Sequence, residues 1–400
     1  MNFMARHILI IPSWYSHARS LGAGSFFRDQ ALALAAAGHK VGLITAKVWG
    51  LRDYRSGSLP EMNVVTVEDD GPIRVYHRNT LHRVPRAPFR DSFAFCRSGS
   101  HLYDAYVAAE GCPDLIHAHG ALYGGLLARN LSARTGIPFV LTEHSSDFAE
   151  AKHRWWQRIL VRRVLKHAGA RVAVSEALAA LMTSQYPEVA RPISVIPNIL
   201  TPAFEEVPDD IVSRPNDEQC PFVFLCVARI SREKNQAGLV RAFAEAFPDE
   251  PGIELHFIGP GDETPIIEAA RQAGVEGQVR IFGALPSEPV RQAMTRAGAV
   301  VLPSFVETFG VVVIESLAVG TPVVATASGG PEGIIAPETG IVVPVGDHDA
   351  LVYALLDIRR RRGEFDAGAL RRSCLERYGR EVVAARLESI YDQIAWGNKP

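Results

Sequence analysis

Two glutamates, Glu307 and Glu315, stand in a segment that could bind a ligand rich in hydroxyl groups. The segment runs from Ser304 to Glu315 and follows a short apolar run that we expect to be a strand. Within it, Gly310 lets the backbone approach a ligand closely. Phe309 to Val311 would form the first turn of a helix, whose N–H groups suit a diphosphate, and Glu315 would lie slightly over two turns into that helix. Two carboxylates at this spacing can accept hydrogen bonds from a sugar and a ribose, although residue types alone leave open that Glu307 caps a helix and Glu315 is a solvated helix residue.

Two cations follow another expected strand, at the start of the second half of the chain. Arg229 and Lys234 lie in the segment Val227 to Asn235, directly after an apolar run. Two cations at the carboxyl end of a strand can clamp a diphosphate and offset the charge of a leaving group. The alternative is a pair of ordinary surface cations in a strand–helix loop.

A glycine-containing loop follows the first expected strand of the chain. Gly22 and Gly24 precede a segment that we expect to be helical, so the loop could cradle a phosphate at a helix N-terminus. The pattern is shorter than a full dinucleotide-binding glycine motif, and a tight turn between strand and helix explains it as well.

Three histidines stand at the ends of expected strands. His117 and His119 follow Leu115, and His144 follows a second apolar run. No two histidines have the spacing of a helical metal-ligand pair, so we expect no metal site. Of His117 and His119 we expect one to point into the core.

The segment around Glu307 resembles the motif of two glutamates separated by seven residues in the family 4 retaining glycosyltransferases, which have the GT-B fold. The stretches 320–325 and 329–332 are also similar to that family. The resemblance implies that Glu307 contacts the transferred sugar near the reacting centre and that Glu315 binds the ribose hydroxyls of the nucleotide. It implies further donor contacts at the helix start, by Thr308, Phe309, Gly310 and Val311.

The same resemblance implies roles for the cations and for a third loop. Arg229 and Lys234 match a pair that holds the donor phosphates, which implies catalysis without a required metal or other cofactor. Backbone groups of Gly283, Ala284 and Leu285 would receive the nucleotide base, so side chains do not reveal whether the substrate is UDP-linked or GDP-linked.

In the first half, His144 matches the family's histidine near the sugar 6-hydroxyl and the reacting centre, and His119 resembles its acceptor-side histidine. The stretches 12–15 and 24–30 are similar to a subgroup active in cell-surface polysaccharide synthesis. The glycine loop would then touch the donor phosphate through Gly24 and the acceptor through Gly22.

The elements that must position these residues form an α/β fold. Apolar runs without period-two alternation, separated by helical segments, predict parallel strands buried on both faces. We interpret each half as a Rossmann-like, doubly wound parallel sheet, with ligands beyond the carboxyl ends of its strands. Under the GT-B resemblance the two domains face a deep interdomain cleft. The expected strands are 7–12, 41–44, 115–117, 139–141, 171–174 and 193–196, then 222–227, 254–258, 279–282, 300–302, 323–325 and 341–343.

The chain's 400 residues suggest two domains. We expect an acceptor-side domain over residues 1–200 and a proline-rich linker over 201–221. A nucleotide-sugar-binding domain over 222–379 follows, and residues 380–400 form a C-terminal helix that packs back on the first domain.

Bulk composition excludes several classes of protein. A formal net charge of −2 gives no sign of a nucleic-acid partner. Five cysteines without a paired motif are typical of reduced thiols in a cytoplasmic protein. No apolar run approaches the ~18 residues of a membrane span.

One segment allows peripheral contact with the inner face of a membrane. Lys152 to His167 is a basic amphipathic helix with two tryptophans, which could lie on an anionic membrane surface. The alternative is a packed helix with a solvated basic face. Residues 359–362 add four cations elsewhere.

We therefore expect a retaining hexosyltransferase. It would transfer a hexose from a nucleotide diphosphate sugar to an acceptor hydroxyl of a glycan, a lipid-linked sugar or a small molecule, by front-face substitution. Two alternatives are a sugar-nucleotide epimerase of the same fold and a non-catalytic nucleotide-sugar sensor. Incubation with donor alone separates an epimerase from a transferase, since an epimerase isomerises the donor and a transferase needs an acceptor. Donor binding without turnover across acceptors would favour the sensor.

Overall fold

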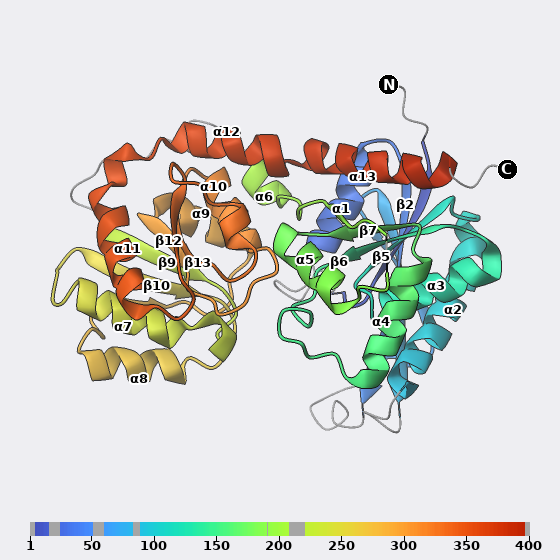
Figure 1. Cartoon of the computed structure of the whole chain (residues 1–400), viewed down its shortest axis with the longest axis horizontal. Helices are drawn as coiled ribbons and strands as arrows, with labels where there is room; N and C mark the ends of the chain where they lie inside the picture. Colours follow the sequence, from blue (N-terminus) through green and yellow to red (C-terminus); the bar gives the residue numbers. More distant parts are fainter. Residues whose placement is uncertain are drawn as a thin grey trace. The chain divides into compact units, whose positions relative to one another are not determined.

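The computed structural model describes residues 5–15, 25–50, 60–82, 89–189, 191–207 and 221–396. The chain divides into two compact α/β units, each with its own sheet (Figure 1). The first unit contains residues 1–197 together with 380–400, and the second contains residues 198–379. The last residues of the chain thus belong to the same unit as the first.

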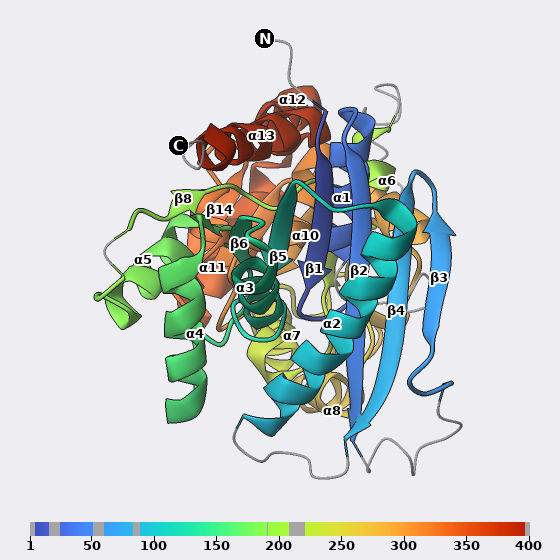
Figure 2. The same cartoon turned by 90° about the vertical axis from the view of Figure 1, so that its right-hand side faces the viewer.

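An eight-stranded sheet forms the centre of the first unit, in the order β3-β4-β2-β1-β5-β6-β7-β8 (Figure 2). All pairs are parallel except β3 with β4, which form an antiparallel hairpin at one edge. Such an edge is common on an otherwise parallel sheet. The strands are β1 His7–Pro12, β2 Lys40–Gly50, β3 Val65–Asp70, β4 Ile73–His82, β5 Leu115–His119, β6 Phe139–Glu143, β7 Ala170–Ala173 and β8 Ser194–Val195.

Helices cover this sheet, and the last of them comes from the end of the chain. Tyr391 on α13 has its hydroxyl 2.7 Å from Nδ1 of His117, which lies on the central strand β5. Glu388 on the same helix lies 3.0 Å from Nε2 of the buried His39. The helices of the unit are α1 Ser25–Ala36, α2 Arg90–Glu110, α3 Gly124–Thr135, α4 Trp155–His167, α5 Glu176–Gln185 and α13 Arg380–Trp396.

The second unit has a six-stranded, fully parallel sheet in the order β11-β10-β9-β12-β13-β14. Its strands are β9 Phe222–Val227, β10 Ile253–Ile258, β11 Val279–Ile281, β12 Ala299–Leu302, β13 Val323–Thr326 and β14 Gly340–Val343. Its helical elements are α6 Pro202–Glu205, η3 Arg232–Lys234, α7 Gln236–Ala246, α8 Thr264–Ala273, α9 Ser287–Arg296, α10 Val311–Ala318, η4 Pro331–Gly333, α11 His348–Arg360, η5 Arg362–Glu364 and α12 Ala367–Tyr378.

Burial on both faces explains why the strands are apolar throughout. Every residue of β12 is buried, as are those of β13. On one side of the second sheet, Phe224 stacks on Phe247 with ring centroids 5.3 Å apart, and Phe243 packs against both. The expectation of two α/β domains with parallel sheets is confirmed.

The start of the expected linker is instead part of the second unit. Pro202 opens α6, where its fixed φ suits the first helical turn. Phe204 and Val207 are buried. Arg371 holds this segment, because its guanidinium donates to the carbonyl oxygens of Phe204 and Val207 at 3.2 and 2.8 Å. The linker prediction is therefore wrong for residues 202–207, and residues 208–220 lie outside the described part of the chain.

Among the described residues, none of the helices combines the length and the apolar character that a membrane span needs.

Candidate active site

The loop that carries Arg229 is held against the loop after the neighbouring strand β10. The N–H of Ile230 donates to the carbonyl oxygen of Pro260 at 2.8 Å. Gly259 has φ of +149°, and a Cβ there would lie 1.9 Å from the carbonyl oxygen of Ala228. Only glycine allows this approach, and it fixes the backbone at Arg229 just beyond the strand end, with the side chain exposed.

Lys234, at the end of η3, reaches across to the loop after β12. Its Nζ lies 2.5 Å from Oε1 of Glu307, and the two side chains are 26% and 12% exposed. The backbone joins the same two loops, since the N–H of Phe305 donates to the carbonyl oxygen of Glu233 at 2.8 Å. A cation and a carboxylate that are distant in sequence therefore form one partly buried pair.

Glu307 is positioned from several sides. Its N–H donates to the carbonyl oxygen of Ser328 at 2.9 Å, and the hydroxyl of Ser304 donates to its Oε1 at 2.8 Å. Gly329, with φ of +118°, packs so closely that a Cβ would lie 2.7 Å from the Glu307 carbonyl oxygen. The N-cap residue of α10 is Gly310 and Glu307 lies three residues before it, so Glu307 is not the N-cap residue that residue types had left open.

Helix α10 begins at Gly310 rather than at Phe309. Gly310 is the N-cap residue with φ of +90°, which favours glycine, and Val311 is the first helical residue. Phe309 is instead buried and packs edge-on against Tyr378, with ring centroids 5.9 Å apart. The first N–H groups of α10 have no carbonyl partner within the helix, as at any helix start. Thr308 precedes this turn and is partly buried.

Glu315 is the fifth residue of α10, so it lies just over one turn from the helix start. The expectation of two turns is wrong because it counted eight residues from Glu307, which lies ahead of the helix, whereas α10 begins at Val311. The carboxylate accepts a hydrogen bond from the Thr201 hydroxyl at 3.3 Å. It is therefore partly buried and hydrogen-bonded rather than a fully solvated helix residue.

The loop after β11 completes this end of the second sheet. Gly283, with φ of +64°, accepts a hydrogen bond from the N–H of Gly259 through its carbonyl oxygen at 2.8 Å. Phe282 is half-exposed and packs against His256. Ala284 is exposed and Leu285 partly buried.

These residues all follow the carboxyl ends of parallel strands in the second unit, where ligands of such sheets bind. The contacts above join the loops after β9, β10, β11, β12 and β13 into one continuous group. The structure therefore brings together Arg229, Lys234, Gly283, Ala284, Leu285, Glu307, Thr308, Phe309, Gly310, Val311 and Glu315.

In the first unit, the three histidines form a buried group. The rings of His117 and His119 lie 4.3 Å apart on β5. His119 Nδ1 is 3.0 Å from Nε2 of His144, which directly follows β6. The expectation that only one of His117 and His119 points into the core is wrong, because residues two apart on a strand share a face. Both are fully buried.

Burial keeps the histidines of β5 neutral. It lowers the pKa of His117 to about 3, and it lowers the pKa of His119 well below its ordinary range, with the neighbouring His117 and His144 adding to the shift. His117 is fixed by two partners, since its Nε2 lies 2.7 Å from the Thr142 hydroxyl and its Nδ1 contacts Tyr391.

Glu143, which the sequence reasoning did not single out, fixes the backbone at His144. Its buried carboxylate accepts the N–H groups of Ala121, His144 and Ser145 at 2.7, 2.9 and 2.8 Å. Burial raises the pKa of Glu143, while these three hydrogen bonds act in the opposite direction. The signal was available, because a carboxylate at the end of a buried apolar strand needs hydrogen-bond partners.

Two aromatic side chains at the start of α1 pack on the histidine pair. Phe26 lies 4.8 Å from the His144 ring, and Phe27 lies 4.8 Å from the His119 ring. The helix therefore begins directly beside His119 and His144. Gly22 and Gly24, predicted to contact acceptor and donor, lie outside the described residues.

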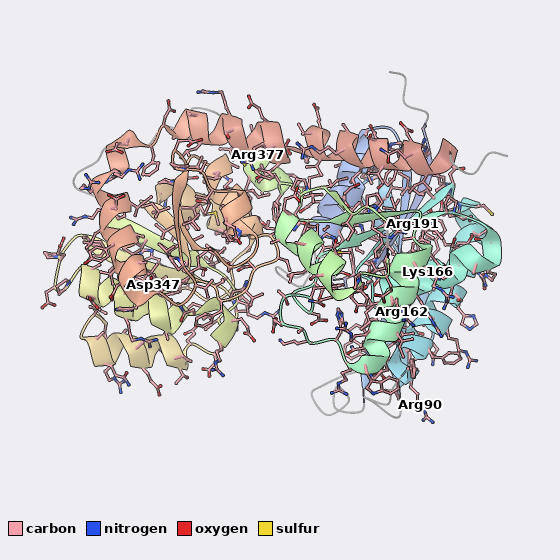
Figure 3. All side chains as sticks on the ribbon, viewed as in Figure 1. Arg90, Arg162, Lys166, Arg191, Asp347 and Arg377 are labelled. Carbon is pink, nitrogen blue, oxygen red and sulfur yellow. The ribbon has the colours of Figure 1, made fainter. Side chains whose placement is uncertain are left out.

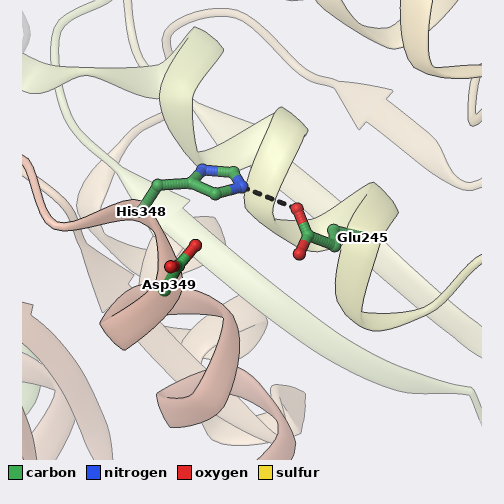
Figure 4. Close-up of side chains that lie close together, drawn as sticks. All are labelled: Glu245, His348 and Asp349. Atoms are coloured by element: carbon green, nitrogen blue, oxygen red, sulfur yellow. Dashed lines mark hydrogen bonds and ion pairs between the residues drawn. The ribbon is translucent and has the colours of Figure 1, made fainter.

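Among the described residues, one group could hold a metal ion by proximity: Glu245, His348 and Asp349, from α7 and α11 of the second unit (Figure 4). All three are exposed, and His348 Nε2 lies 2.8 Å from Glu245. None belongs to the predicted site.

Two family models match the chain and between them span most of it. Residues 22–199 match the "Glycosyl transferase 4-like domain", and residues 209–367 match "Glycosyl transferases group 1".

The relatives of this chain include two from bacteria. Glycogen synthase of Mycobacterium tuberculosis is 28% identical over 367 residues, 88% of this chain and 85% of the relative. D-inositol 3-phosphate glycosyltransferase of Corynebacterium diphtheriae is 31% identical over 186 residues, so the match covers only 43% of each protein.

Solved structures share the fold over nearly the whole chain. Sucrose-phosphate synthase from Thermosynechococcus elongatus has a TM-score of 0.79 at 23% identity, covering 98% of this chain and 100% of that one. Anabaena HepE in complex with UDP and glucose has a TM-score of 0.66 at 16% identity, covering 96% and 99%. The two family models, the relatives and this fold together show that the chain belongs to the family 4 glycosyltransferases of the GT-B fold.

Proposed function

We propose that this glycosyltransferase is a retaining hexosyltransferase with a nucleotide diphosphate sugar as donor and a hydroxyl group as acceptor. The observation that carries the proposal is the contact between Lys234 and Glu307. The contact joins the cation that we propose to bind phosphate and the carboxylate that we propose to bind sugar, at the carboxyl end of one sheet. HepE, which shares the fold, was solved with UDP and glucose, and this supports a donor of the same chemical class.

The donor would bind along the loops of the second unit. Arg229 and Lys234 would hold the diphosphate, helped by the N–H groups at the start of α10. Glu315 would accept hydrogen bonds from the ribose, and the backbone of Gly283, Ala284 and Leu285 would receive the base. Thr308, Phe309, Gly310 and Val311 form the turn that leads from the sugar-binding carboxylate to the helix start.

Glu307 would act on the transferred sugar. Its carboxylate would position the hexose and stabilise positive charge that develops at the anomeric carbon. The bond from that carbon to the donor phosphate would break as the acceptor oxygen attacks the same face, so the configuration is retained. The departing phosphate oxygen would accept the acceptor's proton, and Lys234 and Arg229 would stabilise the charge of the leaving diphosphate.

The pair of Lys234 and Glu307 also suggests how donor binding prepares the site. Without donor, each side chain partly neutralises the other. A diphosphate carries more negative charge than one carboxylate and would compete for Lys234. Glu307, still held by Ser304 and by its own backbone N–H, would then be available to the sugar.

The buried histidines suit recognition of hydroxyl groups. His144 would orient the sugar through its 6-hydroxyl, and His119, which hydrogen-bonds to His144, would serve the acceptor side. A neutral imidazole can donate from one nitrogen and accept at the other. We also propose that Gly24 contacts the donor phosphate and Gly22 the acceptor. Because cations neutralise the leaving group, the proposed reaction requires no metal.

A thermal-shift screen of UDP-, GDP- and ADP-linked hexoses tests donor binding, since a bound donor raises the melting temperature by mass action. The best donor is then incubated with and without candidate acceptors. Acceptor-dependent release of nucleotide diphosphate with retained anomeric configuration is the expected result. Isomerisation of the donor alone would indicate an epimerase, and binding without turnover across acceptors would indicate a sensor.

A further inference from the structure

Helices α2 and α4 of the first unit begin with aromatic residues that are exposed. Phe89, directly before α2, lies 6.0 Å from the ring of Trp155, the first residue of α4. Phe93 follows one turn later on α2. The side chains of Phe89, Phe93 and Trp155 are 39%, 71% and 66% exposed. Large aromatic side chains that gather on a surface mark interaction sites.

The outward side of α4 is basic. Trp155, Arg158, Arg162 and Lys166 recur every three or four residues and so share one side of the helix. The 13 residues of α4 include no aspartate or glutamate. The opposite side is buried in the first unit by Trp156, Val161, Val164 and Leu165. Figure 3 labels Arg162 and Lys166 on this helix, with Arg90 and Arg191 toward its two ends.

Little of this positive charge is neutralised by the protein itself. Arg162 lies 3.9 Å from Glu188, the limit of an ion pair. Within the described part of the chain, Arg163 and Lys166 form no ion pair. The arginines at the end of α11 differ, because Arg359 pairs with Glu250 and Arg360 with Asp357.

We propose that this surface docks the protein on an anionic lipid bilayer. The docking surface comprises the aromatic residues Phe89, Phe93 and Trp155 and the cations Arg162, Arg163 and Lys166. Its charge is complementary to acidic headgroups, and exposed aromatic rings favour the boundary between headgroups and acyl chains. A polyanion alone would account for the cations but not for the aromatic cluster.

The aromatic residues of the docking surface lie at the same edge of the sheet as the histidines of the first unit. Helices α2 and α4 follow the parallel strands β4 and β6, so they begin at the carboxyl edge of the sheet. His119 and His144 lie at that same edge. The aromatic end of the docking surface is therefore on the histidine side of the unit, while Lys166 lies toward the opposite edge of the sheet, where β7 begins. This favours an acceptor presented at the bilayer, a consequence that rests on the proposed function, whereas docking itself does not.

Cosedimentation with lipid vesicles tests docking without any assay of activity. The full chain is mixed with vesicles of phosphatidylcholine alone or with added phosphatidylglycerol, at low and high salt. We expect binding to the vesicles that contain phosphatidylglycerol, weakened by salt, and none to phosphatidylcholine alone.

Two variants with matched controls identify the surface. R162Q/R163Q/K166Q removes three cations and should weaken vesicle binding ~10²-fold, since each cation near an anionic surface contributes a several-fold gain. The control R271Q/R359Q/R360Q removes three exposed arginines of the second unit, so it changes the net charge by the same amount. It should bind vesicles as the wild type does.

F93A/W155A should also weaken binding, and it should do so in high salt as well. Its control is Y353A, which removes an equally exposed ring from α11. Absence of binding to anionic vesicles, or equal losses in variants and controls, would overturn the proposal. Retention on an acidic polymer without vesicle binding would overturn it too and would indicate a polyanionic macromolecule as the partner.

Discussion

Lys234 Nζ and Glu307 Oε1 are 2.5 Å apart although 73 residues separate them in sequence. The contact forms because β9 and β12 are neighbours in the sheet, so the loops that follow them emerge side by side. A crossover that brings two distant segments together is a property of the doubly wound topology. The pair is the centre of the proposed donor site.

Replacing the carboxylate tests the role of Glu307. E307Q keeps the shape of the side chain but removes its charge, so transfer should decrease ~10²–10³-fold if the carboxylate stabilises positive charge in the transition state. Donor affinity should change far less. Initial rates and donor titrations check both, with E338Q, an exposed glutamate of the same unit, as the control. Unchanged turnover by E307Q would exclude the proposed role.

Removing the cation should affect binding and rate together. K234A loses a charge that would contact the diphosphate in the bound donor and in the leaving group, so the rate should decrease by ~10²-fold or more and donor affinity should weaken. R232A removes an exposed cation from the same η3 turn and should leave both close to wild type. If K234A and R232A lowered the rate and the donor affinity equally, the loss would come from the lower positive charge of the region and not from a specific role of Lys234.

The close approach at Gly259 predicts that a single methyl group disturbs the donor site. In G259A the new Cβ would overlap the carbonyl oxygen of Ala228, so the loop that carries Arg229 must shift. Such overpacking costs ~1–3 kcal/mol, and donor affinity should decrease. G277A, where a Cβ meets no atom within 4 Å, is the control. Donor titration of both variants checks the prediction, which equal affinities would contradict.

The neutral His117 predicts a pH dependence of stability. Its pKa is about 3 in the folded protein and near 6.5 when unfolded, so below about pH 6.5 protons bind the unfolded state preferentially. The contribution of His117 is complete above that pH and decreases as the pH falls, by up to ~1.4 kcal/mol per unit.

Urea unfolding at several pH values between 7.5 and 5.5 measures this effect. Trp14, Trp49, Trp155, Trp156 and Trp396 all fall within the first unit, so tryptophan fluorescence reports on that unit. H117N should show a shallower decrease than the wild type. H101N, which removes an exposed histidine from α2, should follow the wild type. If the unfolding free energies of H117N and wild type decreased in parallel as the pH falls, His117 would take up a proton as readily in the folded state as in the unfolded state, which would contradict the prediction.

The hydrogen bond between Tyr391 and His117 predicts that α13 stabilises the first unit. Y391F removes a buried hydroxyl and leaves Nδ1 of His117 without that partner, which should cost ~1–3 kcal/mol. Y353F, an exposed tyrosine of α11, should cost nearly nothing. Urea unfolding followed by far-UV circular dichroism, which reports on both units, compares them, and equal midpoints for the two variants would contradict the prediction.

The sequence predicted the buried strands well and the exposed ones poorly. The expected bounds of β1 and β9 are confirmed, because a strand covered on both faces is a continuous apolar run. The hairpin of β3 and β4 was not predicted. Most side chains of β3 are exposed, and only β4 pairs with it, so no apolar run marks it.

For the candidate site, the sequence predicted the residues but not their partners. Glu307 and Lys234 could be located because both follow strands. Their contact depends on the order of strands in the sheet, which no local pattern encodes. The late start of α10 was missed because Phe309, which packs against Tyr378, continues the apolar pattern of the helix. The catalytic and binding roles stay predictions that the variants above address.

Because α13 completes the first unit, that unit is discontinuous in sequence. During synthesis the ribosome must produce the whole of the second unit before Glu388 and Tyr391 become available to His39 and His117. Domains generally fold in the order in which they emerge, and here the order is reversed, so the unit that starts the chain is the last to finish. A chain that ended at residue 379 would join a completed second unit to a first unit in which His39 and His117 each lack the hydrogen-bond partner that α13 provides.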